Sequence, residues 1–144
     1  MTQVGNTTRD SIFDLGGVRH AGVIHRSVQY IHGHYAQHLT LEDMAQQAYL
    51  SPAYFGRIFK EGMGESFSAY LTRVRIEHSK ELLRYETIRL TDIAQLVGFE
   101  DQSYFSRVFK RIVGLSPRQY REACTAAARP YQKGYHVHRV SLTR

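Results

Sequence analysis

The sequence predicts an all-α fold of about seven helices, in which two helix-turn-helix subdomains are joined by one long connecting helix. Three observations support this fold class. Apolar residues recur at three- and four-residue steps from residue 23 onward, which is the spacing of helices that bury one face. One long segment occurs twice in the chain, and each copy contains a turn and a helix cap that separate two helices.

The composition is that of a small globular protein without disulfides. With 144 residues, the chain can form one domain or two very small ones. Its single cysteine, Cys124, excludes an internal disulfide and a multi-thiolate metal site, so the fold must rest on packing. The sequence has no run of about 18 apolar residues, and residues 1–10 do not resemble a secretory signal. We therefore expect a cytoplasmic protein without a membrane span.

The positive charge lies mainly in the second half of the chain. Residues 1–85 contain nine Lys and Arg against eight Asp and Glu, whereas residues 86–144 contain ten against five. Most of the net charge of +6 therefore belongs to residues 86–144. Such a surface favours a polyanion as partner, although composition by itself does not distinguish DNA from RNA or anionic lipid.

The two ends of the chain carry weaker patterns than the middle. Residues 1–22 are rich in Gly and Thr and are predicted to be a flexible lead-in. A first helix is expected over residues 23–38, and Thr40 with Asp43 forms an approximate capping box for the next helix. The tail, residues 125–144, shows an alternation that predicts a short strand or the start of a further module.

An internal repeat organises the middle of the chain. The segment LEDMAQQAYL, residues 41–50, matches LTDIAQLVGF, residues 90–99, at an offset of 49. After one inserted residue the offset becomes 50, and residues 51–70 match residues 101–120. Two copies of one structural unit are therefore predicted within residues 23–124. Residues shared by the two copies are Tyr54/Tyr104, Phe55/Phe105, Arg57/Arg107, Phe59/Phe109, Lys60/Lys110, Gly64/Gly114, Ser66/Ser116 and Tyr70/Tyr120.

Each copy contains a short helix, a turn and a second helix with two unlike faces. Ser51-Pro52 and Asp101 are suited to begin the second helices. Aromatic residues at this helical spacing are more often core residues than stacking platforms for single strands. The inner face is therefore predicted to be buried, and it consists of Tyr54, Phe55, Ile58 and Phe59 in one copy and Tyr104, Phe105, Val108 and Phe109 in the other.

The outer face of the two second helices is small, polar and basic. Such side chains suit hydrogen bonding to base edges and to phosphates. The candidate DNA-binding residues on this face are Ala53, Gly56, Arg57, Lys60, Gln102, Ser103, Ser106, Arg107, Lys110 and Arg111.

A helix from Ser66 to Tyr85 is predicted to connect the copies. At 1.5 Å per residue it would be about 30 Å long. Recognition helices that enter successive major grooves on one face of DNA are about 34 Å apart, so the predicted length is of the right scale.

The residues GFEDQSYFSRVFKRIVGLSPRQYR, at positions 98–121, resemble the signature of the AraC/XylS family of bacterial transcription regulators. The first copy and the connecting helix resemble the corresponding parts of that family, so the likeness covers residues 23–124. The resemblance implies a sequence-specific regulator, most often an activator, that binds two successive major-groove segments of double-stranded promoter DNA. It also implies RNA polymerase as a second partner.

The resemblance further implies which residues contact bases. It places Ala53, Gly56 and Arg57 in one groove. Because Ala53 and Gly56 are small, readout in that groove would rest mainly on Arg57. The second groove would be read by Gln102, Ser103, Ser106 and Arg107.

Other classes of function are weaker interpretations of the same sequence. No set of nucleophile, base and orienting group stands out, so neither an enzymatic activity nor a cofactor is expected. A non-catalytic helical protein-interaction module is the alternative, although it would show more than two repeats. His34 and His38 have the spacing of metal ligands, as do His136 and His138, but no Cys or acidic partner is in register, so surface roles are expected.

A small-molecule effector is not expected within this chain. The 22-residue lead-in is too short to enclose a ligand pocket. The sequence is therefore interpreted as a stand-alone regulator or as a fragment of a longer one.

Overall fold

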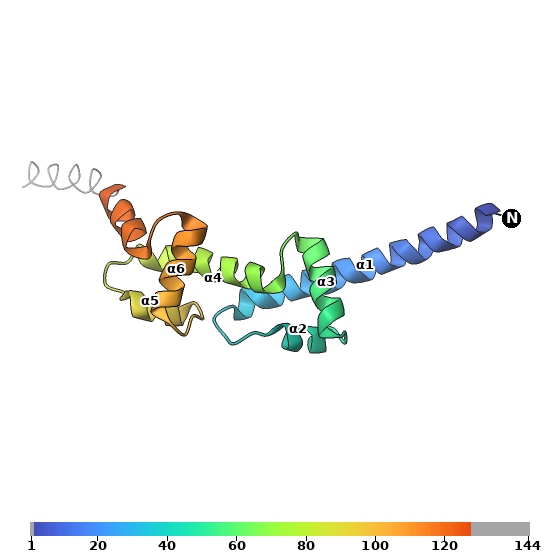
Figure 1. The fold of residues 1–144 in the computed structure, drawn as a ribbon, viewed down its shortest axis with the longest axis horizontal. Helices are drawn as coiled ribbons and strands as arrows, with labels where there is room; N and C mark the ends of the chain where they lie inside the picture. Colours follow the sequence, from blue (N-terminus) through green and yellow to red (C-terminus); the bar gives the residue numbers. More distant parts are fainter. Residues whose placement is uncertain (1, 128–144) are drawn as a thin grey trace, which may run out of the picture. The chain divides into compact units, whose positions relative to one another are not determined.

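The computed structural model describes residues 2–127, with side chains described from Gly17 onward except for Val18. This part of the chain contains seven helices and no strand, which confirms the all-α prediction (Figure 1). It divides into two compact units, with the boundary after Val74.

The first unit is built from α1 (Thr2–His34), α2 (Leu41–Gln47), α3 (Pro52–Met63) and the first part of α4 (Phe67–Leu83). Helix α3 packs against both α1 and α2. A Cβ atom at Gly62 would lie 3.3 Å from Ile24, so the absence of a side chain lets α1 and α3 approach closely. The buried core of this unit consists of Ile31, Met44, Ala45, Phe55, Phe59, Phe67, Tyr70, Leu71 and Val74.

The second unit is built from the rest of α4, α5 (Leu90–Leu96), α6 (Gln102–Val113) and a helix over residues 117–127. Helix α6 packs against α5, as α3 packs against α2 in the first unit. The buried residues of this unit include Ile76, Leu83, Ile93, Ala94, Val97, Phe99, Phe105, Val108, Phe109 and Pro117.

Helices α2, α3 and α6 begin at the capping residues that the sequence predicts. Thr40 and Asp43 form the capping box of α2, because each side chain accepts a hydrogen bond from the other residue's backbone N–H. Ser51 caps α3, with Pro52 as its first residue, and Asp101 caps α6 through the N–H of Ser103. Gly64 and Gly114 end α3 and α6 in the left-handed conformation.

The turn between the two helices of each helix-turn-helix has the same hydrogen bonds in both units. In the first unit, Leu50 N–H donates to Ala45 O and Tyr49 N–H to Gln46 O. The equivalent bonds of the second unit are Phe99 to Ala94 and Gly98 to Gln95. These are the two bonds of a Schellman motif, which requires a left-handed residue directly after the helix. Gly98 occupies that position with φ 101°, whereas Tyr49 occupies it with φ 58°.

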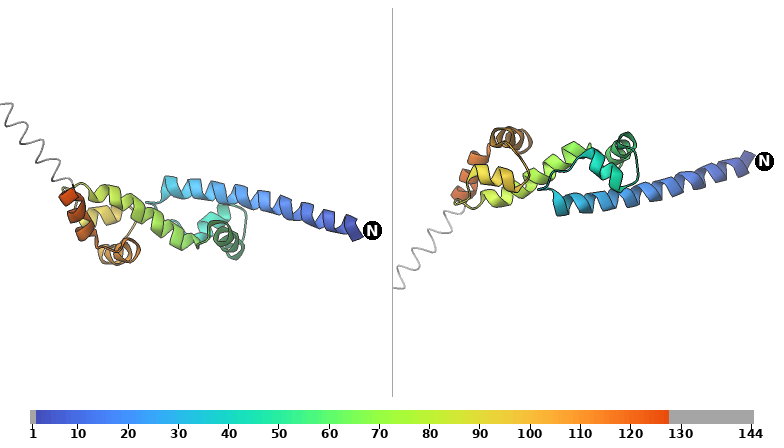
Figure 2. Two further views of the ribbon diagram at one scale, coloured as in Figure 1. Left: turned by 90° about the horizontal axis from the view of Figure 1, so that it is seen from above. Right: turned by 90° about the horizontal axis from the view of Figure 1, so that it is seen from below.

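The boundaries of α1 and α4 differ from the predicted ones. Helix α1 begins at Thr2, so residues 2–22, expected to be a flexible lead-in, are helical (Figure 2). Starting a helix is costly, but extending an existing one adds a hydrogen bond with each residue, so the packed part of α1 can propagate toward the N-terminus. At its other end α1 stops at His34 rather than near His38. Helix α4 ends at Leu83, two residues before the predicted end.

The alternating tail segment, predicted to form a short strand or the start of a further module, lies outside the described residues. Residues 125–127 continue the last helix, and residues 128–144 lie outside the described part of the chain.

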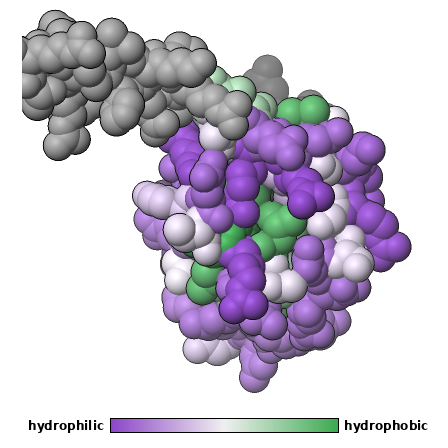
Figure 3. Space-filling model, turned by 90° about the vertical axis from the view of Figure 1, so that its left-hand side faces the viewer, coloured by the Kyte–Doolittle hydropathy of each residue, from purple (hydrophilic) through white to green (hydrophobic). Residues whose placement is uncertain are grey.

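The face drawn in Figure 3 is mostly hydrophilic. On the face drawn in Figure 3, polar residues surround a small hydrophobic area. The large apolar side chains that are exposed in the described part are Tyr49, Tyr85, Leu96, Tyr104, Ile112 and Leu115. No described helix is both long and apolar enough to cross a membrane.

Arg121 joins two parts of the second unit. Its Nε donates to the Leu83 carbonyl at the end of α4 (3.0 Å), and its Nη2 donates to the Ile88 carbonyl in the following loop (2.6 Å). Carbonyls at the end of a helix have no partner within the helix. Arg121 therefore ties the helix of residues 117–127 to the connection between α4 and α5.

Tyr49→Gly should stabilise the protein. A left-handed conformation costs a non-glycine residue about 1 to 2 kcal/mol. Tyr49 is 95% exposed, so removing its ring loses little packing. Glycine is more flexible than tyrosine in the unfolded chain, and this offsets part of the gain. We therefore expect the free energy of unfolding to rise by about 0.5 to 1 kcal/mol. Urea denaturation followed by circular dichroism measures this, and Gly98→Ala, the opposite change at the equivalent position, should lower stability.

Arg121→Met should destabilise the second unit. The substitution keeps an apolar stem but removes two hydrogen bonds from a charged donor, which should lower the free energy of unfolding by about 1 to 3 kcal/mol. In Arg121→Lys the lysine can reach only one of the two carbonyls. Its free energy of unfolding should therefore lie between that of the unaltered protein and that of Arg121→Met. Equal stability of all three proteins in thermal denaturation would contradict this role.

Candidate nucleic-acid interface

The outer face of α3 consists of Ala53, Gly56, Arg57 and Lys60, and the structure places all four on one side of the helix. They are spaced three and four residues apart, and the buried residues of α3 lie on the other side. Arg57 and Lys60 are exposed. Gly56 is half-buried, because a Cβ atom there would meet the methyl groups of Leu41 at 3.6 and 3.7 Å.

The outer face of α6 is larger and more basic. Ser103, Arg107, Lys110 and Arg111 are exposed, and Gln102 and Ser106 are half-buried. Helix α6 contains three basic residues and no acidic one, whereas α3 contains Glu61 in addition to its two basic residues. The equivalent of Glu61 in the second unit is the basic residue Arg111. Each predicted residue therefore lies on an accessible helix face, and each unit contributes one such face.

The basic residues of both outer faces have no ion-pair partner among the described residues. In the described part of the chain, no ion pair involves Arg57, Lys60, Arg107, Lys110 or Arg111. Exposed cations without a carboxylate partner are free to bind an anion such as a phosphate, or to donate to base edges.

Two aromatic residues predicted for the core lie at its edge. Phe55, Phe59, Phe105 and Phe109 are fully buried, as predicted. Tyr54, however, is half-buried, and Tyr104 is 49% exposed. The phenol group needs a hydrogen-bond partner or water, so a tyrosine is more stable at the boundary of the core than inside it.

The edge position brings Tyr54 into contact with Arg57 of the outer face and with His20, which no sequence pattern marked. Its hydroxyl is 2.7 Å from Nε2 of His20 on α1. The guanidinium carbon of Arg57 lies over its ring, 5.1 Å from the centroid. His20 and Tyr54 are 34 residues apart, so no local pattern in the sequence could have indicated this pair.

Three of the described histidines make contacts with tyrosines, whereas His38 is exposed. His20 and His32 each contact a tyrosine hydroxyl, and His34 stacks on Tyr30 with ring centroids 3.9 Å apart. The described part of the chain holds no group of three residues suited to bind a metal. His136 and His138 lie outside the described residues.

Comparison with known proteins finds the same domain. A family model described as a helix-turn-helix domain matches residues 44–123. Regulatory protein PocR of Salmonella typhimurium is 33% identical over 129 residues, which are 90% of this chain and 41% of that protein. The chain thus spans less than half of this relative.

Solved structures show the same fold. The C-terminal domain of AraT, a response regulator from Geobacillus stearothermophilus, is 41% identical with a TM-score of 0.67, covering 70% of this chain and 84% of that one. The DNA-binding domain of AdpA, a global transcriptional factor, was solved in complex with a target DNA. It is 26% identical with a TM-score of 0.69, and the match covers 72% of this chain and 94% of that one. The chain belongs to the AraC/XylS family of helix-turn-helix transcription regulators.

Proposed function

We propose that the chain binds double-stranded DNA at specific sequences and regulates transcription, with α3 and α6 as its recognition helices. The observation that carries this proposal is the repeated outer face. Both units present an exposed arginine and an exposed lysine three residues later, Arg57 with Lys60 and Arg107 with Lys110. None of the four has an ion-pair partner in the described part of the chain.

The chemistry of these faces suits a major groove. A guanidinium can donate two parallel hydrogen bonds to O6 and N7 of guanine, and an amide such as that of Gln102 can pair with adenine. Lys60, Lys110 and Arg111 lie one turn farther along their helices and are suited to phosphates. Small residues such as Ala53 let the helix approach the bases and can contact a thymine methyl group.

The comparisons support the same function. The similar domain of AdpA was solved with a target DNA, and PocR is named as a regulatory protein. Activation of transcription and contact with RNA polymerase remain predictions that rest on the family resemblance.

Selection of bound sites from random double-stranded DNA tests the proposal directly. We expect one enriched site with two conserved segments, and a mobility shift on that site that resists competition by unrelated DNA. Failure to retain any DNA would instead favour the alternative of a helical protein-interaction module.

Affinity should fall steeply with salt, because basic side chains displace counterions from phosphates. Each neutralised phosphate contributes about 0.9 to the slope of log K against log salt concentration. Lys110→Gln should therefore reduce the slope by about 0.9 and weaken binding equally on selected and random DNA. A titration at several salt concentrations measures this, and a slope near zero for the unaltered protein would contradict DNA binding.

The two arginines should act unequally. Arg107 has Gln102, Ser103 and Ser106 on the same face, so Arg107→Ala should cost roughly 1 to 3 kcal/mol and relax the preference at one base pair. Arg57 has only Ala53 and Gly56 beside it. Arg57→Ala should therefore remove most of the specificity of its half-site.

Both arginine variants lose one positive charge, which provides the control. If the arginines act only through charge, each variant loses the same affinity on selected DNA and on random DNA. Measurement of both variants on both DNAs at one salt concentration distinguishes base readout from charge.

A further inference from the structure

Tyr54 connects helix α1 to the outer face of α3. Its hydroxyl is hydrogen bonded to Nε2 of His20, and the two rings meet edge to face, with centroids 5.7 Å apart and an interplanar angle of 69°. The guanidinium carbon of Arg57 lies over the same ring, 5.1 Å from its centroid. Tyr54 therefore has one partner that belongs to the fold and one that belongs to the proposed interface.

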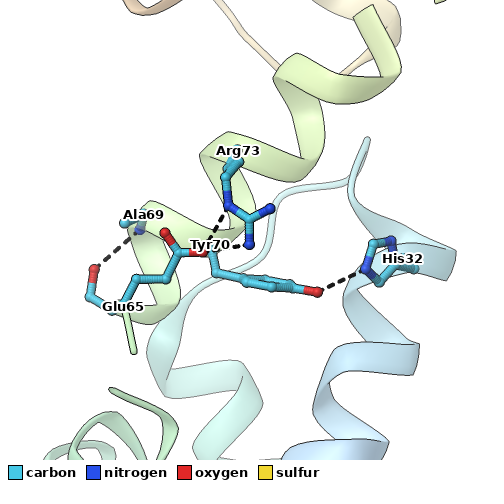
Figure 4. A network of polar contacts seen from close by, with 6 residues as sticks. His32, Glu65, Ala69, Tyr70 and Arg73 are labelled. Atoms are coloured by element: carbon cyan, nitrogen blue, oxygen red, sulfur yellow. Dashed lines mark hydrogen bonds and ion pairs between the residues drawn. The ribbon is translucent and has the colours of Figure 1, made fainter. Parts of the chain in front are cut away.

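The first unit contains a second set of the same three residue types, shown in Figure 4. Nε2 of His32, also on α1, is 2.8 Å from the hydroxyl of Tyr70, and these rings are edge to face at 5.9 Å and 88°. The guanidinium carbon of Arg73 lies 5.1 Å from the centroid of the Tyr70 ring. In both sets the arginine follows the tyrosine by three residues, which puts both side chains on one side of their helix.

The two sets differ in what else holds the arginine. Arg73 donates from Nε (2.9 Å) and from Nη2 (2.6 Å) to Oε1 of Glu65. Arg57 has no acidic partner in the described part of the chain. The Arg73 guanidinium is thus committed to the fold, whereas the Arg57 guanidinium is held over a ring with its N–H donors available to a ligand.

The second unit lacks this arrangement. The ring of Tyr104, the equivalent of Tyr54, meets Phe99 with centroids 6.0 Å apart. Within the described residues Tyr104 has no hydrogen bond to a histidine, and Arg107 has no stacking contact with a ring. Arg107 instead shares its face with polar neighbours that Arg57 does not have.

We propose that His20 and Tyr54 are positioning residues for Arg57 and so determine specificity at the DNA half-site read by the first unit. This inference rests on the proposed function. A long arginine side chain loses much conformational freedom when it binds a base, and a preformed orientation reduces that cost. The His20 hydrogen bond fixes the Tyr54 ring, and the ring limits the directions in which Arg57 can point. Helix α1 thereby contributes to base readout without touching DNA.

The test compares Tyr54→Phe with Tyr70→Phe. Each substitution removes one tyrosine hydroxyl that is bonded to a histidine of α1, and each leaves the ring under the arginine. Discrimination is measured as the ratio of Kd values for the selected site and for a site with one base pair exchanged in the first or the second segment. Tyr54→Phe should lower discrimination in one segment only, by about 2- to 10-fold, the effect of one hydrogen bond. Tyr70→Phe should leave discrimination unchanged in both segments.

Three further variants complete the experiment. His20→Ala should reproduce the effect of Tyr54→Phe, and Tyr54→Leu, which also removes the ring, should have a larger effect. In an Arg57→Ala background, Tyr54→Phe should produce no further loss, because the two residues act through one guanidinium. Thermal denaturation should show similar small losses of stability for Tyr54→Phe and Tyr70→Phe.

The outcomes separate this inference from the proposed function. If Arg57→Ala leaves discrimination intact, Arg57 does not read bases and the proposed role of α3 fails. If Arg57→Ala removes discrimination while Tyr54→Phe and His20→Ala preserve it, α3 reads DNA without help from α1 and the positioning proposal is overturned. Equal losses for Tyr54→Phe and Tyr70→Phe would likewise overturn it, because they would indicate a general effect of stability.

Discussion

Two buried phenylalanines on the inner side of α3, and two on the inner side of α6, fix how each of these helices is turned about its axis. Phe55 and Phe59 lie one helical turn apart with ring centroids separated by 5.8 Å, and Phe105 and Phe109 repeat this spacing in the second unit. All four are fully buried. A helix can bury two such rings in only one rotation about its axis, so the residues on the opposite side must face outward. The apolar core therefore fixes which side chains of α3 and α6 are accessible at the surface.

The same scaffold carries different chemistry in the two units. Helix α6 combines three basic residues with Gln102 and two serines, whereas α3 offers small residues and one arginine supported by a ring. Packing constrains only the inner side, so the outer sides are free to differ. The residue at the left-handed position of the turn also differs between the units. Tyr49 and Gly98 allow the same pair of hydrogen bonds, although the left-handed conformation is less favourable for the tyrosine.

Helix α1 has more than one role in the first unit. Ile31 is buried in the core, and Gly62 of α3 allows α1 to lie in direct contact with it. His20 and His32 add polar contacts to two tyrosines on α3 and α4. A tyrosine at the edge of a core can be held by its hydroxyl and can hold another side chain with its ring. This combination links the packing of α1 to the exposed surface of α3.

The sequence by itself determined the fold class, the repeat, the helix caps and the accessible faces, because these depend on local spacing and on residue type. Thr40, Ser51 and Asp101 act within three residues of their own positions, and the buried phenylalanines follow from helical periodicity. The tertiary structure alone decided that Tyr54 and Tyr104 lie at the edge of the core, that α1 continues to Thr2, and that His20 meets Tyr54. These features depend on contacts between residues far apart in the chain, or on how far a helix extends beyond its packed part. Neither is encoded in a local pattern.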